Sequence, residues 1–289
     1  MFIVDFFRTI VTLGGNFDWP TVKQYLFDST IVQGAEITIL LAVLAQALGV
    51  IIGLLLYLIR RSPIGILRAI GEFYVWFFRG TPLLVQLLFL YGFVEEFHFA
   101  RPIRSIDFFP SLGYQYVYLE FFLPALVAFA LNEGAYMAEI VRAGIDSIDP
   151  GQMEAAKSLG MTYGMAMRRV ILPQAARVIL PPLGNEFNSM LKTTSLASTI
   201  GVLELYEAAF DISHTLFRPL ELAVVASLWY LAMTTLWGFV QSWLERRFNA
   251  SNLEGPRSAS FIDRLLGRAR VEIPAGEAAQ EAILTGGRR

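Results

Sequence analysis

Long apolar runs divide the chain into segments. Positions 37–59 and 222–243 contain no charged residue, and each exceeds the roughly 20 helical residues that cross the apolar core of a bilayer. Three further runs, at 82–94, 117–140 and 178–203, are also apolar but are shorter or contain polar residues. The pattern predicts an all-α integral membrane protein with about five transmembrane helices.

The run at 82–94 is preceded by a break, Arg79-Gly80-Thr81-Pro82, and before that by another apolar stretch at 70–78. Neither stretch alone reaches the roughly 20 residues that a helix needs to cross the apolar core of a bilayer. Proline in the first turn favours the start of a helix. We therefore expect an interfacial or partly inserted helix before the break and a spanning helix after Pro82.

The distribution of basic residues predicts the orientation. Ten lysines and arginines fall on one side of the five spans before the tail is counted, and five fall on the other. The side richer in basic residues is normally cytoplasmic. We therefore expect an extracytoplasmic segment at 1–33, a transmembrane domain at 34–247 with a cytoplasmic loop at 141–177, and a mostly disordered cytoplasmic tail at 248–289.

Composition restricts the chemistry. Of 289 residues, 55% are hydrophobic and 17% are charged, against about 25% charged in soluble domains. The net charge of -2 and the lack of a basic stripe argue against nucleic-acid binding. With no cysteine and only His98 and His214, a metal site is not expected. Because P-loop, dinucleotide and nucleophile-elbow motifs are absent, we expect no catalytic residues and no enzyme activity.

The loop at 141–177 contains a helix with strong boundary signals. Asp149 followed by Pro150 is typical of an N-cap and first helical position, and Gln152 three residues after the cap fits a capping box. Gly160 predicts the C-terminal end of a helix of about ten residues. A loop with such defined ends is expected to be a built structure.

The faces of this short helix differ in character. Met153, Ala156 and Leu159 lie one or two turns apart on one face. The small residues Ala155, Ala156 and Gly160 would permit close approach by another protein.

Several motifs carry a family resemblance. Glu154-Ala155-Ala156, then Gly160, then Val170-Ile171-Leu172-Pro173 resembles the EAA loop of ABC importer permeases, with Val170 in place of the usual isoleucine. Between about Gln33 and Arg247 the chain is similar to the polar amino-acid uptake family, of the histidine and glutamine permease type. The further segments that carry this similarity are Phe78–Gln86, Gly134–Glu139, Gly151-Gln152, Leu172–Ala175 and Lys192–Leu196. Thr193 departs from the acidic residue that often follows the lysine.

The resemblance implies the type I ABC importer permease fold in a multi-pass protein of the bacterial cytoplasmic (inner) membrane. It implies that Glu154, Ala155, Ala156 and Gly160 form the loop that couples to an ATPase. It also implies the partners: a second permease subunit, identical or paralogous, two cytoplasmic ABC ATPase subunits, an extracytoplasmic amino-acid-binding protein and membrane lipid. ATP and Mg are expected on the ATPase, and no cofactor on this chain.

Polar residues inside the spans are costly and often face a partner or a polar path. Glu139 and Arg142, three residues apart, are expected to form a structural ion pair. Helix packing could explain the remaining polar residues, but their clustering favours a substrate path. The candidates for that path are Glu133, Asn185, Glu186, Asn188 and Lys192.

Two other functions are compatible with these residues. An ion-coupled secondary transporter would use Glu133, Glu139 or Glu186 to carry a proton, although the internal repeats common in such carriers are not visible in the sequence. A membrane anchor or receptor without transport activity is the second alternative. The best-supported function is that of the permease subunit of an ATP-driven, binding-protein-dependent importer for a polar amino acid.

Overall fold

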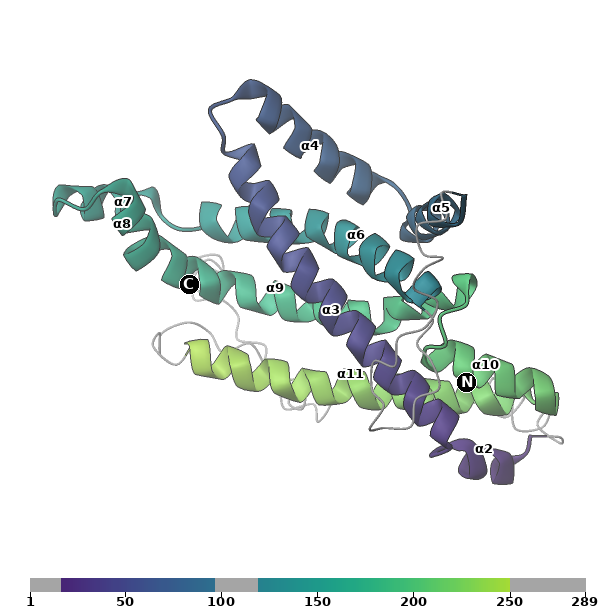
Figure 1. Ribbon diagram of the computed structural model, residues 1–289. Coiled ribbons are helices and arrows are strands. Elements are labelled where there is room, and N and C mark those ends of the chain that lie inside the picture. The colour runs from purple at the N-terminus through teal and green to yellow at the C-terminus, as the bar shows by residue number, and fades with distance from the viewer. Residues whose placement is uncertain (1–16, 97–118, 250–289) are drawn as a thin grey trace, which may run out of the picture. The chain divides into compact units, whose positions relative to one another are not determined.

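The computed structural model describes residues 17–96 and 119–249, and every element in these two stretches is a helix (Figure 1). Residues 250–289 of the predicted tail and the first half of the predicted N-terminal segment lie outside the described residues, and the first two tail residues belong to the last helix. In chain order the elements are α2 (Trp19–Tyr25), α3 (Ser29–Arg60), α4 (Gly65–Gly80), α5 (Leu83–Glu96), α6 (Leu119–Asp146), α7 (Pro150–Ser158), α8 (Tyr163–Ala166), the π-helical turn η2 (Met167–Ile171), α9 (Leu172–Thr193), the 3₁₀ helix η3 (Thr194–Ile200), α10 (Leu205–Leu216) and α11 (Pro219–Asn249).

Three of these helices, α3, α6 and α11, are long and apolar enough to cross a membrane. The pair α4 and α5 qualifies as a fourth span when taken together, with a bend of 107° between them. The expected fourth span at 178–203 is not among these candidates. Helix α9 begins earlier and ends at Thr193, and Arg177, Glu186 and Lys192 lower its apolar character.

Helix boundaries differ from the predicted spans where capping or packing extends a helix. Helix α3 begins at Ser29, inside the segment 1–33, because the Asp28 carboxylate accepts a hydrogen bond from Thr30 N at 2.8 Å. Helix α6 continues past residue 140 to Asp146, so the loop at 141–177 begins as helix. Gly144 and Ile145 are buried there, and their packing keeps this end of α6 helical.

Small residues allow α3 and α6 to pack closely. A Cβ atom at Gly53 would lie 2.4 Å from the Met137 Cβ, and one at Gly49 would lie 2.5 Å from the Glu133 Cγ. Since association of membrane helices depends on close van der Waals contact, such glycines bring the two backbones together. Figure 1 shows α3 crossing α6.

The bend between α4 and α5 is held by amide side chains. Gln86 Nε2 donates to the Phe78 carbonyl at 2.9 Å and to Thr81 Oγ1 at 2.7 Å. Asn132 Nδ2, from α6, donates to the same Phe78 carbonyl at 2.9 Å and to Gln86 Oε1 at 3.1 Å. Irregular backbone is tolerated inside a membrane only when its polar groups are satisfied. The predicted break before Pro82 is therefore confirmed as a built feature.

A π-helical turn leads into α9. Leu172 N donates to the carbonyl of Met167, five residues earlier, and Pro173 follows at the start of α9. Because proline has no N–H to donate and its ring crowds the preceding turn, the wider turn accommodates it without interrupting the helical path.

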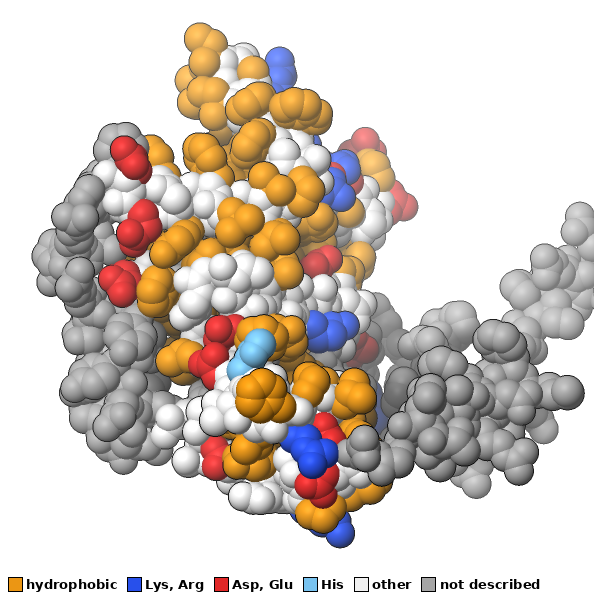
Figure 2. Space-filling view, turned by 90° about the vertical axis from the view of Figure 1, so that its right-hand side faces the viewer, with side chains coloured by type: hydrophobic (Ala, Val, Ile, Leu, Met, Phe, Trp, Pro, Cys, Tyr) orange, Lys and Arg blue, Asp and Glu red, His pale blue; other side chains and the backbone are white. Residues whose placement is uncertain are grey.

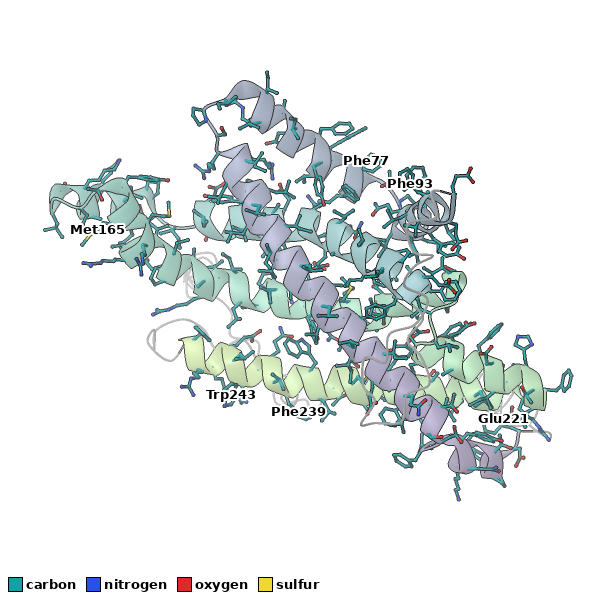
Figure 3. All side chains as sticks on the ribbon, viewed as in Figure 1. Phe77, Phe93, Met165, Glu221, Phe239 and Trp243 are labelled. Carbon is teal, nitrogen blue, oxygen red and sulfur yellow. The ribbon has the colours of Figure 1, made fainter. Side chains whose placement is uncertain are left out.

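Large apolar side chains cover much of the outer surface (Figure 2). On α4, Phe73 is 62% exposed and Trp76 is 69% exposed, and on α11 Phe239 and Trp243 also face outward (Figure 3). Soluble proteins seldom expose so much contiguous apolar surface. The surface is therefore suited to lipid or to partner subunits.

Candidate functional site

The predicted short helix in the loop is α7, and its N-terminal cap is confirmed. Asp149 Oδ1 accepts a hydrogen bond from Gly151 N at 2.7 Å, and Pro150 occupies the first helical position. The expected capping box does not form, since Gln152 Oε1 accepts from Gln174 Nε2 of α9 at 3.3 Å. Gln152 therefore ties α7 to α9 instead of closing its own helix.

Gly160 terminates the helix as predicted. Its φ is +81°, in the left-handed region that favours glycine. Gly160 N donates to the Lys157 carbonyl at 2.9 Å, and Met161 N donates to the Ala156 carbonyl at 3.1 Å. These two bonds form a Schellman motif. Among the residues that the structure describes, a Cβ at position 160 would meet no other atom within 4 Å, so glycine is needed there for its backbone conformation.

The two sides of α7 have different roles. Ala156 is buried, and Met153 packs against an apolar cluster that includes Tyr57 of α3 and Ile145 of α6. Leu159, expected on the same face, is 80% exposed, because the helix ends at Ser158 and the chain turns away. Of the three small residues predicted to allow close approach by another protein, Ala156 is buried inside this chain, and only Ala155 and Gly160 are exposed.

Glu154 and Ala155 on α7 and Gly160 just after it are exposed, and two large apolar side chains near them in the chain are exposed as well. These are Leu159, which was expected on the inner face, and Tyr163 at the start of α8, which is 59% exposed and which the sequence did not single out. Apolar residues close to the glycine that ends a helix were the sequence signal that could have revealed these exposed side chains. The surface combines a rigid capped helix with exposed apolar groups, which suits protein binding.

Glu133 lies buried between α6 and α3. It is 4% exposed, and its Oε1 atom has no hydrogen-bond partner among the described residues. Gln46 of α3 is 6% exposed, and its Nε2 donates a hydrogen bond to Met137 Sδ at 3.6 Å. Its Oε1 also has no hydrogen-bond partner among the described residues. Leaving such groups unpaired costs about 1–3 kcal/mol each. Gln46 was missed because a single glutamine in a long apolar run gives no sequence signal.

The candidates on α9 differ in burial and in contacts. Glu186 is half-buried. Asn188 has a buried Oδ1 without a partner among the described residues. Asn185 is exposed, and its Oδ1 accepts from Gln241 Nε2 of α11 at 3.2 Å, whereas Lys192 is exposed. Burial therefore separates Glu186 and Asn188 from the exposed Asn185 and Lys192.

The ion pair between Glu139 and Arg142 is present, with Arg142 Nη2 at 2.8 Å from Glu139 Oε2. It is part of a larger network that also includes Arg60 of α3. Within residues 17–96 and 119–249, no group of three or more histidine or acidic side chains could hold a metal ion.

Glu204 is a further buried carboxylate that sequence reasoning missed. It is fully buried before α10 and accepts hydrogen bonds from Tyr230 Oη at 2.7 Å and Thr38 Oγ1 at 3.3 Å. It also caps α10 by accepting from Glu207 N at 2.9 Å. The three contacts join α3, α10 and α11, so Glu204 stabilises this end of the bundle.

The geometry can be compared with known proteins. The family model described as "Binding-protein-dependent transport system inner membrane component" matches residues 16–250. The chain belongs to this family. It is a permease subunit of binding-protein-dependent amino-acid ABC importers and a multi-pass protein of the cytoplasmic membrane. Family membership favours this function over the ion-coupled carrier and the non-transporting anchor.

Curated relatives cover most of the chain. The arginine transport system permease protein ArgU of Corynebacterium glutamicum is 44% identical over 234 residues, which are 80% of this chain and 72% of that protein. The L-cystine transport system permease protein TcyB of Bacillus subtilis is 39% identical over 240 residues, 83% of this chain and 94% of that protein.

Solved structures share the fold. The crystal structure of an amino acid ABC transporter with histidines matches with a TM-score of 0.69 at 38% identity, over 80% of this chain and 99% of that one. The MetNI methionine ABC transporter in an inward-facing conformation matches with a TM-score of 0.59 at 18% identity, over 76% and 96%. The second likeness supports the fold alone, and both agree with the type I importer permease fold.

Proposed function

We propose that α7 is the helix through which this permease subunit couples amino-acid import to a separate ATPase. The observation that carries the proposal is an exposed helix, capped at both ends, with its inner side packed on α3 and α6. A helix fixed in this way passes force to the bundle, whereas a flexible loop would absorb it. Glu154, Ala155 and Gly160 face outward for docking, and Leu159 and Tyr163 supply apolar contact.

The proposed assembly contains a second permease subunit, two cytoplasmic ATPase subunits that bind ATP and Mg, and an extracytoplasmic binding protein. The presence of a second permease subunit is supported by exposed polar side chains on α9, at Asn185, Ser189 and Lys192. Polar groups at membrane depth need either a protein neighbour or a water-filled path. The α9 face would be covered by the other permease subunit, with the amino terminus outside and the carboxyl terminus in the cytoplasm.

The proposed substrate path passes Glu133 of α6. It also passes Gln46 of α3 and Glu186 and Asn188 of α9. Buried oxygens of Gln46, Glu133 and Asn188 that have no hydrogen-bond partner among the described residues support this proposal. Every amino acid carries an α-ammonium group, and carboxylate and amide oxygens are acceptors for its N–H donors. Since relatives are named for substrates as different as arginine and cystine, we propose a polar amino acid as the substrate class.

Reconstitution in lipid vesicles tests the whole proposal. The chain is purified together with its ATPase and binding protein, and uptake of labelled amino acids is measured beside ATP hydrolysis. ATP-dependent uptake that also requires the binding protein is the expected result. Uptake driven by a proton gradient without ATP would contradict it in favour of an ion-coupled carrier, and no uptake under either condition would favour an anchor.

A further inference from the structure

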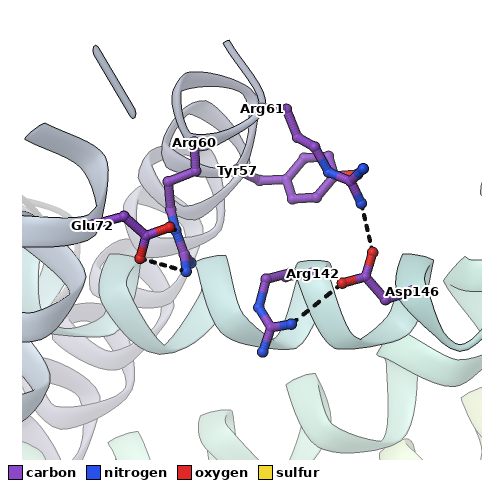
Figure 4. Close-up of a pocket in the computed structure, with 6 residues that line it drawn as sticks. All are labelled: Tyr57, Arg60, Arg61, Glu72, Arg142 and Asp146. Carbon is purple, nitrogen blue, oxygen red and sulfur yellow. Dashed lines mark hydrogen bonds and ion pairs between the residues drawn. The ribbon is translucent and has the colours of Figure 1, made fainter. Parts of the chain in front are cut away.

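A network of ion pairs connects α3, α4 and α6 at the end of the bundle that leads into α7 (Figure 4). Five of its members, together with Tyr57, line a pocket of about 380 Å³. Positive and negative side chains alternate along it, so that each arginine lies between carboxylates or next to one. The members are Glu72, Arg60, Glu139, Arg142, Asp146 and Arg61.

Glu139 is the centre of this network. Its Oε1 accepts from Arg60 Nη1 of α3, and its Oε2 accepts from Arg142 Nη2 of α6 at 2.8 Å. Arg79 of α4 brings Nη1 to 4.0 Å from the same Oε2. The side chains of Arg60 and Glu139 are only 13% and 19% exposed. Partly buried charges of this kind depend strongly on one another, because removal of one partner leaves the other uncompensated.

Arg60 extends the contact to α4 with a rigid geometry. Its Nε donates to Glu72 Oε1 and its Nη2 donates to Glu72 Oε2, both at 2.9 Å. A bidentate pair of this type fixes orientation as well as distance. One guanidinium therefore joins Glu72 of α4 to Glu139 of α6 across the end of α3.

One end of the network adjoins α7. Asp146 is the last residue of α6 and is paired with both Arg61 and Arg142. The residue before it, Ile145, is buried in the apolar cluster that Met153 of α7 also contacts. A displacement of α7 would therefore act directly on the paired end of α6.

The other end adjoins the bend between α4 and α5. Arg79 lies in the last turn of α4, with its guanidinium 5.2 Å from the centroid of the Tyr136 ring as well as near Glu139. The neighbouring Phe78 carbonyl is bound by Gln86 and Asn132. The last turn of α4 is thus attached to α6 in two ways, through the Phe78 carbonyl and through the Arg79 side chain.

We propose that Glu139 is a positioning residue for transport, which transmits movement of α7 to the bend between α4 and α5 through Arg60 and Arg79. This inference rests on the proposed coupling role of α7. Glu139 touches no substrate in this mechanism. Its charge keeps α3, α4 and α6 in register, so that ATP-driven movement of α7 reaches the bend instead of being lost in sliding of the helices.

The test is Glu139→Gln in the complete complex, with ATPase and binding protein, in lipid vesicles. We expect normal recovery of the complex and normal ATP hydrolysis without binding protein. Uptake per ATP hydrolysed should fall by about 2- to 30-fold, the range that 0.5–2 kcal/mol along a coupled network produces. Arg79→Gln, whose side chain is 44% exposed, should lower the same ratio even if the buried substitution reduces yield.

Asp211→Asn on α10 is the matched control, because it neutralises an exposed carboxylate that is not a member of the network. It should change the ratio less than Glu139→Gln does. The inference is overturned if Glu139→Gln and Arg79→Gln keep the wild-type ratio, or if uptake and hydrolysis decline in proportion with complex recovery. Failure of the wild-type complex to import with ATP would instead refute the proposed function.

Discussion

Gly160 offers a pair of substitutions that separates backbone strain from docking to the ATPase. At φ +81°, an L-residue with a Cβ pays about 1–2 kcal/mol, which is a factor of about 5–30 in a folding equilibrium. Because no atom lies within 4 Å of a Cβ placed there, alanine and tryptophan should pay this same cost within the permease. Any further difference between the two variants must come from a partner.

Gly160→Trp adds a large ring to the surface that we propose contacts the ATPase. Overfilling a close-packed contact costs about 1–3 kcal/mol, which corresponds to about 5- to 160-fold in Kd. The affinity of the purified ATPase is measured for both variants in lipid nanodiscs, together with thermal unfolding and uptake. We expect equal unfolding temperatures for Gly160→Ala and Gly160→Trp, with weakened ATPase binding and abolished uptake in Gly160→Trp alone.

The comparison has clear refuting results. If the tryptophan variant binds the ATPase as tightly as the alanine variant and imports at the same rate, α7 is not the docking surface. If the alanine variant loses as much binding as the tryptophan variant, strain in the helix cap is the cause and the steric reasoning is wrong.

Three other substitutions have defined outcomes. Asp149→Ala should remove the N-cap of α7, lower the stability of this helix by about 0.5–2 kcal/mol and reduce binding-protein-stimulated ATP hydrolysis. Asp149→Asn should retain the cap and the stimulated hydrolysis. Equal activity of the two variants would contradict this role of the cap. Glu133→Gln should change the affinity or rate of uptake with normal membrane insertion, and unchanged kinetics for every amino acid tried would remove Glu133 from the path. Gly53→Val should destabilise the contact with α6 by about 1–3 kcal/mol, measured as a lower unfolding temperature in detergent. Gly92→Ala is its control, because a Cβ there would meet no atom within 4 Å, and equal unfolding temperatures would refute the packing argument.

The segments with strong local signals were predicted well. Asp149, Pro150 and Gly160 determine where α7 begins and ends, because caps and left-handed turns depend on a few neighbouring residues. The break before Pro82 is local for the same reason. The end of α6 was predicted less well, since burial of Gly144 and Ile145 by other helices extends it beyond the apolar run.

The candidate site was only partly accessible from the sequence. Glu133 could be recognised as a charge within an apolar segment, but its neighbour Gln46 belongs to another helix and is 87 positions away in the chain. Glu139 and Arg142 were paired from their spacing on one helix. Arg60 and Arg79 join Glu139 from two other helices, and no spacing rule relates residues on different helices.

The sequence by itself determined that the chain is a helical membrane protein, which motifs relate it to amino-acid importers, and where its short loop helix begins and ends. These properties depend on hydrophobicity and capping, which act over a few residues to a few turns. Only the tertiary structure decided that Ala156 faces inward while Leu159 faces outward, that the polar residues of α9 differ in burial, and that Glu139 connects three helices. The physical reason is that a contact between helices depends on their crossing geometry, which close packing of the whole bundle sets.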